Sequence, residues 1–222
     1  MSGMVLVATP ARLDTPRVFL ARAEELAERL TYAPRQRVLY LNEQQPGGGK
    51  YGPNAAARNQ LVERFLRPWH EWVLWVDVDI LEYPADLIER LMAVANRWDH
   101  GQGAIAAPMV WMERVGEGPV GIPTGGWFYD IGGFVGLDGE HADFETGPKG
   151  GAEVELASVG CVYLMPAWVF RDGMRYRPRG DEVEHLSLMR AAREAGVRVV
   201  ASRGVEVTHA YLPKYGEGWH HG

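Results

Sequence analysis

Residues 72–79 read Trp-Val-Leu-Trp-Val-Asp-Val-Asp, an apolar run that ends in two aspartates one residue apart. A short continuous apolar segment of this kind is typical of a buried strand in a parallel sheet. In open α/β sheets, ligands bind beyond the carboxyl ends of such strands. Side chains at positions i and i+2 of a strand point to the same side of the sheet. Asp77 and Asp79 are therefore predicted to face a ligand together.

The two aspartates are candidate metal ligands. Mg²⁺ and Mn²⁺ prefer carboxylate oxygens, and such an ion can offset the charge that develops on a departing diphosphate. The alternative is a pair of aspartates that only shape a turn, because a bare Asp-x-Asp pattern is common. The apolar strand before the pair and the amphipathic helix after it favour the metal site.

Strand-like and helix-like segments alternate along the rest of the chain. Apolar runs predict strands at 4–8, 38–41, 72–76, 104–107, 159–164, 197–200 and 205–208. Helical spacing of apolar residues predicts helices at 17–30, 54–66, 84–98 and 183–195. Thr9-Pro10 is expected in a loop, Asn54 at a helix N-cap and Pro84 at a first helical position. The alternation indicates one Rossmann-like α/β domain, with a mostly parallel mixed sheet flanked by helices.

Composition and charge exclude several other classes of protein. The formal net charge is -6, and the 23 Lys and Arg residues form no long run, so the chain lacks the electrostatic footprint of a duplex-binding protein. Cys161 is the single cysteine, which excludes an internal disulfide framework. No segment approaches the roughly 20 apolar residues of a membrane span. These features lead us to expect a cytoplasmic protein of bacterial or viral origin.

The pattern resembles the GT-A glycosyltransferases, and within them the fungal Golgi mannosyltransferases that build mannan backbones. The similar segments are 57–59, 72–80, 82–88, 106–111 and 182–184, of which the stretch from 58 to 88 is the most specific. The resemblance implies a single GT-A domain over residues 1–222. Residues from 1 to about 109 would bind a nucleoside diphosphate sugar, and those from about 110 to 222 would form the acceptor side. The implied reaction is metal-dependent transfer of a hexose to an acceptor hydroxyl.

The resemblance also implies roles around the metal. Asp79 would bind Mn²⁺ or Mg²⁺ directly, and Asp77 would lie near the metal or the ribose of the donor. His209 looks like the C-terminal histidine that completes the metal shell in many GT-A enzymes. The alternative for His209 is a strand-end histidine that bonds to backbone.

Other residues match donor-binding positions of such enzymes. Thr9, Pro10 and Glu43 would hold the nucleoside, and Arg58 would meet the diphosphate. Gly160 would let the backbone approach the sugar and the acceptor closely. Two alternatives stay open: Arg58 could be an ordinary surface arginine, and Gly160 could serve only a turn.

Glu182 and Glu184 resemble an acidic pair near the acceptor. Either could deprotonate the acceptor hydroxyl if the reaction inverts configuration, although the fungal enzymes retain it. The usual motif ends in Glu-Asp, whereas Glu184 is followed by His185. His185 is a further candidate base, and the alternative for it is a solvated histidine at a helix start.

The acceptor and the exact class of activity stay open. A glycan is the first expectation for the acceptor, and a lipid precursor, a protein or a phage-type modified DNA base are alternatives. A non-catalytic protein that binds nucleotide sugars or glycans is a further possibility. A phosphatase of the haloacid dehalogenase type would carry its Asp-x-Asp after the first strand, unlike this chain. Tyr51 after Lys50 excludes a P-loop, which needs Ser or Thr there.

Overall fold

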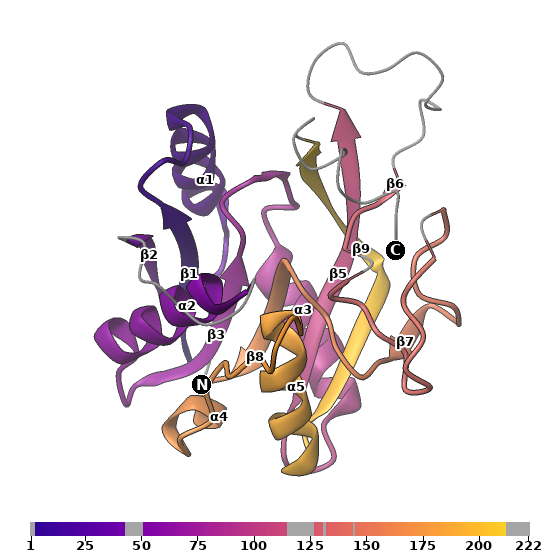
Figure 1. Cartoon of the computed structure of the whole chain (residues 1–222). Helices are drawn as coiled ribbons and strands as arrows, with labels where there is room; N and C mark the ends of the chain where they lie inside the picture. Colours follow the sequence, from indigo (N-terminus) through magenta and orange to yellow (C-terminus); the bar gives the residue numbers. More distant parts are fainter. Residues whose placement is uncertain (1–2, 43–50, 115–126, 131, 144, 212–222) are drawn as a thin grey trace.

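The computed structural model describes residues 3–42, 51–114, 127–130, 132–143 and 145–211 (Figure 1). The strands are β1 (Met4–Arg12), β2 (Arg35–Asn42), β3 (His70–Val76), β4 (Ile80–Glu82), β5 (Ala104–Arg114), β6 (Trp127–Phe128), β7 (Glu153–Glu155), β8 (Val162–Pro166) and β9 (Arg198–Tyr211). The helices are α1 (Arg17–Arg29), α2 (Gly52–Phe65), α3 (Leu87–Trp98), α4 (Trp168–Arg171) and α5 (Glu184–Glu194). None of the described helices is long and apolar enough to cross a bilayer.

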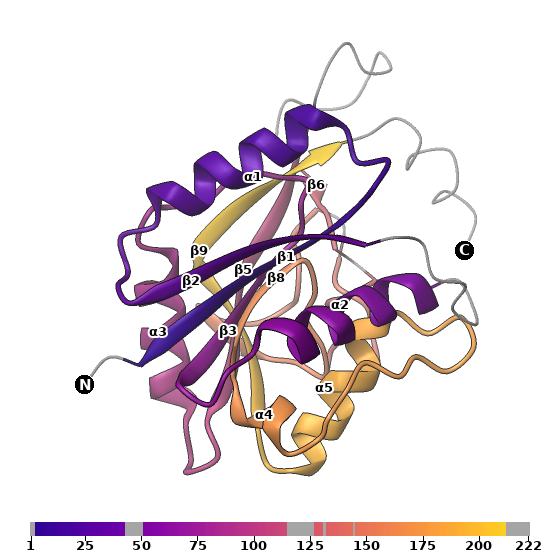
Figure 2. The ribbon, with the colours of Figure 1, turned by 90° about the vertical axis from the view of Figure 1, so that its left-hand side faces the viewer.

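One mixed sheet organises these elements. Its strand order is β2-β1-β3-β8-β5-β9-β4, with β6 added to β5 and β7 added to β9. β1 runs parallel to β2 and β3, and β5 runs parallel to β9, while β8 is antiparallel to both of its neighbours. Figure 2 shows the sheet between α1 and α3 on one side and α2, α4 and α5 on the other. The expected α/β architecture of a mostly parallel sheet flanked by helices is confirmed.

The apolar run that ends at the two aspartates lies in the middle of this sheet. Residues 73–76 are all buried, because β1 and β8 flank β3 and helices cover the sheet. The predicted stripe on α3 is buried as well, at Leu87, Ile88, Leu91, Val94 and Ala95. Continuous apolar strands and an apolar helix stripe therefore build the core, as their spacing predicted.

Two expected breaks fall inside strands. The loop expected at Thr9-Pro10 is wrong, because β1 continues to Arg12 and Pro10 pairs with Tyr40 of β2. Pairing of β1 with β3 ends at Ala8, so Pro10 lies where only one neighbouring strand remains. A proline costs least at such an edge position. Likewise β9 is one strand, where we expected two, and its register to β5 shifts directly after Pro108.

Two helices begin at other residues than expected. α3 starts at Leu87 rather than at Pro84, because β4 occupies residues 80–82 and the Pro84 carbonyl accepts the Leu87 NH. α2 starts at Gly52, so Asn54 lies inside the helix and is not its N-cap. In both cases the type of element was predicted and only its first turn was misplaced.

Candidate functional site

Asp77 and Asp79 lie in the turn between β3 and β4, at the carboxyl end of β3. Asp77 follows the last residue of β3, and the Ile80 NH bonds to the Asp77 carbonyl at 3.2 Å. The two side chains are 25% and 19% exposed. Because β3 has ended before Asp77, the alternation rule for strands no longer applies, and the two carboxylates bind different partners.

The partner of Asp79 is His209, near the end of β9. The imidazole Nε2 lies 3.1 Å from Asp79 Oδ1, and Nδ1 lies 2.7 Å from the Ala210 carbonyl oxygen. The Ala210 NH in turn bonds to the Asp79 carbonyl at 2.9 Å. His209 is only 1% exposed, so these bonds fix its ring.

This pair shifts the pKa values of both members. Burial acts to lower the pKa of His209, but the Asp79 carboxylate outweighs burial, and the pKa is raised above its ordinary value. Burial acts to raise the pKa of Asp79, and the charge and hydrogen bond of His209 outweigh that, so the pKa is lowered. The pair is therefore held as a carboxylate and an imidazolium over a widened pH range.

Asp79 and His209 have the chemistry of metal ligands. A metal-binding histidine donates its second ring NH to a carbonyl or carboxylate, which is the bond from Nδ1 of His209 to Ala210. A metal would replace the proton on Nε2. Within the described residues, no three His, Cys, Asp or Glu side chains are grouped closely enough to hold a metal. A metal bound by Asp79 and His209 would therefore need further ligands, such as the oxygens of a diphosphate.

The partner of Asp77 is Arg58, on α2. Arg58 Nη2 lies 2.6 Å from Asp77 Oδ1, and Arg58 Nε lies 3.5 Å from Glu184 Oε1. The guanidinium carbon lies 5.1 Å from the centre of the Trp75 ring and 5.8 Å from that of Tyr176. Arg58 is 2% exposed. The alternative of an ordinary surface arginine is therefore wrong.

Glu182 and Glu184, the acidic pair at the start of α5, lie in different environments. Glu184 is 3% exposed and lies against Arg58, whereas Glu182 forms an ion pair with Arg190 at 2.5 Å. His185 is buried rather than solvated, with Nε2 3.5 Å from Glu184. Burial, followed by the charge of Arg58, lowers the pKa of His185 to about 3, so the ring is neutral at physiological pH.

Of the other residues predicted to bind the donor, Thr9, Pro10 and Gly160 belong to the described part of the chain. Thr9 is buried in β1 and Pro10 is half-buried beside it. Glu43 lies outside the described residues. Gly160 precedes β8, and a Cβ there would come within 2.1 Å of Asp130 Oδ2. A side chain at this position would therefore displace the carboxyl group of Asp130.

Tyr129, Asp130 and Cys161 also lie at this site, and none of them was predicted as a metal or donor ligand. The Tyr129 ring stacks on His209, with centroids 3.5 Å apart and an interplanar angle of 15°. Asp130 Oδ2 accepts a hydrogen bond from the Cys161 thiol at 3.2 Å. Burial raises the pKa of Asp130 to about 6. The aromatic and glycine residues around Tyr129-Asp130 were visible in the sequence, but nothing in their spacing indicated these partners.

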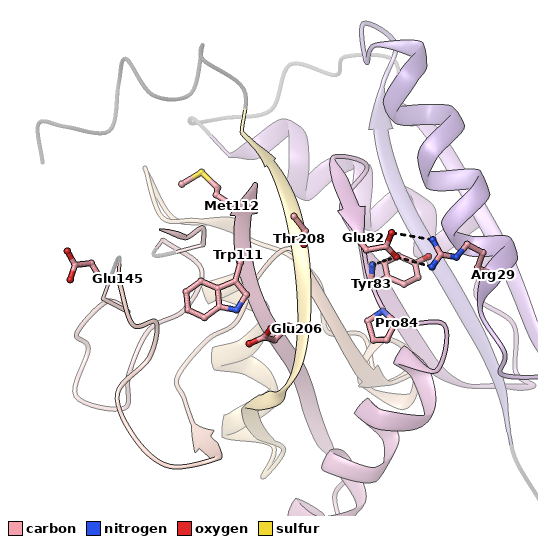
Figure 3. Close-up of a pocket in the computed structure, with 9 residues that line it drawn as sticks. All are labelled: Arg29, Glu82, Tyr83, Pro84, Trp111, Met112, Glu145, Glu206 and Thr208. Atoms are coloured by element: carbon pink, nitrogen blue, oxygen red, sulfur yellow. Dashed lines mark hydrogen bonds and ion pairs between the residues drawn. The ribbon is translucent and has the colours of Figure 1, made fainter. Parts of the chain in front are cut away.

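A pocket of about 820 Å³ lies beside β4, β5 and β9. Figure 3 shows that Glu82 bonds with Arg29 at one end of the pocket, with Trp111 and Glu206 across from them. None of the residues predicted to bind metal or donor lines it. It is therefore separate from the cluster built on Asp77 and Asp79.

Comparison with known proteins gives sequence similarity over one segment. Residues 54–121 match the model of the Anp1 family. The chain is 42% identical over 55 residues to a vanadate resistance protein of Candida albicans, and 38% identical over 69 residues to the mannan polymerase II complex ANP1 subunit of Saccharomyces cerevisiae. These matches cover 25% and 29% of this chain, and only 11% and 12% of the two relatives.

Similarity to solved structures covers nearly the whole chain. One is GalNAc-T7 with UDP, GalNAc and Mn²⁺, with a TM-score of 0.57, 11% identity and coverage of 99% of this chain and 44% of that one. A second is a mutant of Drosophila β1,4-galactosyltransferase 7 with manganese, UDP-Gal and xylobiose, with a TM-score of 0.51, 13% identity and coverage of 98% and 74%.

The comparisons overturn the expected location. Both curated relatives are fungal, and one is a mannan polymerase subunit, so the expectation of a bacterial or viral cytoplasmic protein is wrong. They also give no support to a phage-type DNA acceptor. The predicted fold and resemblance are confirmed: the chain has the GT-A fold, and residues 54–121 carry the sequence pattern of the Anp1 family.

Proposed function

We propose that the chain is a metal-dependent glycosyltransferase that moves a sugar from a nucleoside diphosphate sugar to a hydroxyl of a glycan. The observation that carries the proposal is the pair of Asp79 and His209, fixed at the carboxyl end of β3 in a GT-A fold. Two further facts support it: the similar solved structures contain UDP or UDP-Gal together with manganese, and one relative is a mannan polymerase subunit.

In this proposal Asp79 and His209 hold Mn²⁺ or Mg²⁺. The bound ion would neutralise part of the charge on the departing diphosphate. Asp79 is the stronger candidate ligand of the two aspartates, because its present partner can give up a proton while its Nδ1 bond to Ala210 persists. Asp77 lies in the same turn, close to the metal or the ribose.

Arg58 acts in this proposal mainly by orienting Asp77. A guanidinium cannot lose its charge in a protein, and Arg58 is 2% exposed between Asp77 and Glu184. Its Nη1 atom is buried without a hydrogen bond. Direct contact between Arg58 and a diphosphate would therefore require the guanidinium to turn towards the donor when the donor binds.

The donor and acceptor sides follow the two halves of the chain. Residues from 1 to about 109 would bind the nucleotide sugar, with Thr9, Pro10 and Glu43 near the nucleoside. Residues from about 110 to 222 would form the acceptor side, with Gly160 beside the sugar and the acceptor. If the reaction inverts configuration, Glu182 or Glu184 would have to leave its arginine partner before it could accept a proton.

A thermal-shift panel tests the proposal. UDP, GDP and CDP, and their sugars, are each added with and without Mn²⁺, and stabilisation by one nucleotide only in the presence of Mn²⁺ is the expected result. Release of that nucleotide from its sugar donor, measured by chromatography, then separates an enzyme from a non-catalytic binding protein. Stabilisation by phosphomonoesters alone would instead favour a phosphatase.

A further inference from the structure

The segment Tyr129-Asp130 contacts both sides of the proposed metal site. It follows β6, whose two residues pair with β5 next to the end of β9. Tyr129 is anchored to this part of the sheet, since its NH bonds to the Val110 carbonyl at 2.9 Å. From this position the two side chains reach towards different partners.

Tyr129 contacts the histidine side. Its ring lies parallel to the His209 ring at a centroid distance of 3.5 Å. The Ala210 carbonyl already holds Nδ1 of the imidazole, and the stacked phenol ring restrains the plane of the imidazole. Together they leave Nε2 aimed at Asp79.

Asp130 contacts the aspartate side through Cys161. The Cys161 thiol donates to Asp130 Oδ2 at 3.2 Å, and the Cys161 carbonyl accepts the Asp77 NH at 3.0 Å. Cys161 has a φ of 55°, a left-handed conformation that is uncommon for a residue with a β-carbon. Strained residues of this kind persist only where their surroundings hold them.

The carboxyl group of Asp130 is itself closely confined. Its Oδ1 accepts the Gly133 NH at 2.9 Å. A Cβ at Gly133 would come within 2.4 Å of Asp130 Oδ2, and one at Gly160 within 2.1 Å. The absence of side chains at these two positions is what allows the carboxyl group to reach the Cys161 thiol.

We propose that Tyr129 and Asp130 are positioning residues that set the spacing between the Asp77–Asp79 turn and His209. Tyr129 acts by stacking on the His209 ring, and Asp130 acts by holding Cys161 in the conformation that bonds to the Asp77 NH. The inference rests on the proposed metal-dependent function. It explains why a strained cysteine and two crowded glycines lie around one carboxyl group.

The test measures the affinity for Mn²⁺ in the presence of UDP or GDP, by isothermal titration. Residues that orient metal ligands typically contribute 10–100-fold to metal affinity. Tyr129→Ala is expected to weaken Mn²⁺ binding by about tenfold, while Tyr129→Phe keeps the ring and is expected to stay within about twofold of the parent. Asp130→Asn replaces the Oδ2 atom that accepts the Cys161 thiol hydrogen with an NH₂ group. This variant is expected to weaken Mn²⁺ binding by about tenfold.

Cys161 supplies a second series of variants. Cys161→Ser retains a hydrogen-bond donor towards Asp130 and is expected to keep the parent Mn²⁺ affinity, whereas Cys161→Ala loses the donor and is expected to lose about tenfold. Phe128→Leu is the control for packing alone, because Phe128 packs on Trp111 and Phe134. It is expected to lower the melting temperature without weakening Mn²⁺ binding.

The outcomes separate the inference from the proposed function. If Tyr129→Ala and Asp130→Asn lower only the melting temperature, as Phe128→Leu does, the positioning role is overturned. Equal Mn²⁺ affinities of Cys161→Ser and Cys161→Ala would overturn the role of the thiol. Asp79→Ala is measured alongside. If this variant also binds Mn²⁺ and nucleotide normally, the proposed function fails. If Mn²⁺ binding is lost in Asp79→Ala alone, the proposed function stands and only the positioning inference is overturned.

Discussion

Asp77 and Asp79 are separated by one residue, yet they are held in opposite ways. Asp77 is bound by Arg58, whose charge is permanent. Burial acts to lower the pKa of Arg58, but the charges of Asp77 and its other neighbours together raise it well above its ordinary value. Asp79 is bound by His209, which can exchange its Nε2 proton for a metal ion. Under the proposed function, Asp77 is therefore a charge fixed by Arg58, and Asp79 is the aspartate that can bind a metal.

The largest expected effect concerns Asp79 itself. Asp79→Ala should abolish metal-dependent nucleotide binding, a loss of at least about 100-fold, because it removes one of the two proposed metal ligands. Calorimetric titration of nucleotide with and without Mn²⁺ measures the loss. Binding at the parent level would remove the distinction between the two aspartates.

A comparably large effect on stability is expected from Arg58. Arg58→Met leaves the carboxylates of Asp77 and Glu184 without their cation, and breaking a buried pair in this way costs about 3–5 kcal/mol. Urea denaturation measures the free energy of unfolding. Arg12→Met is the matched control, since Arg12 forms an exposed ion pair with Asp14, for which less than about 1 kcal/mol is expected. Similar losses in the two variants would show that Arg58 is not a structural anchor.

The pair of Asp79 and His209 predicts an opposite pH dependence for stability and for metal binding. The raised pKa of His209 means that its contribution to stability is complete below about pH 6.5, the unfolded value, and is lost as the pH rises through the folded value. Over the same rise the imidazole becomes free to bind a metal. The melting temperature of the metal-free protein, minus that of His209→Gln, should therefore fall while Mn²⁺ affinity increases. Parallel changes in the two quantities would contradict the exchange of a proton for a metal.

A smaller pH effect is expected from Asp130. Its pKa is raised to about 6 by burial, so the folded protein binds a proton that the unfolded chain releases at lower pH. Stability of the parent relative to Asp130→Asn should therefore decline between about pH 4 and pH 6 and then level off. Denaturation curves of both proteins at several pH values test this. A constant difference would mean that folding does not raise the pKa of Asp130.

The smallest effect separates the two glutamates. Glu182→Gln removes a surface ion pair with Arg190 and is expected to cost less than about 1 kcal/mol. Glu184→Gln removes a buried partner of Arg58 and is expected to cost more. Urea denaturation of both variants measures the difference. If Glu182→Gln proved the more damaging, Glu182 rather than Glu184 would belong to the site.

Several elements of the fold were predictable because their causes are local. The run at 72–76 and the α3 stripe follow from apolar spacing, and the two aspartates follow directly from the end of the strand. The strand ends were not predictable in the same way. Pro10 is tolerated in β1 because the pairing of β1 with β3 has already ended at Ala8. Where that pairing ends depends on segments that are distant in the sequence.

Some partners within the site could not be predicted for a related reason. The resemblance gave His209 as a metal ligand beside Asp79, although the two lie 130 positions apart, but nothing indicated that Asp130 meets Cys161 from a segment with little regular structure. Arg58 was identified as a candidate, but its burial between two carboxylates depends on the packing of α2 against α5. Residue types, spacing and the resemblance therefore pointed to the chemistry, and the tertiary contacts add the different partners of Asp77 and Asp79.

The position of the metal can be measured directly. Crystals grown with Mn²⁺ and the nucleoside diphosphate that stabilises the protein would be examined by anomalous diffraction at the manganese absorption edge. We expect a single strong peak within coordination distance of both Asp79 and His209, with the Arg58–Asp77 ion pair intact. A peak coordinated by Asp77 and distant from His209 would contradict the assignment of Asp79 and His209 as the metal ligands.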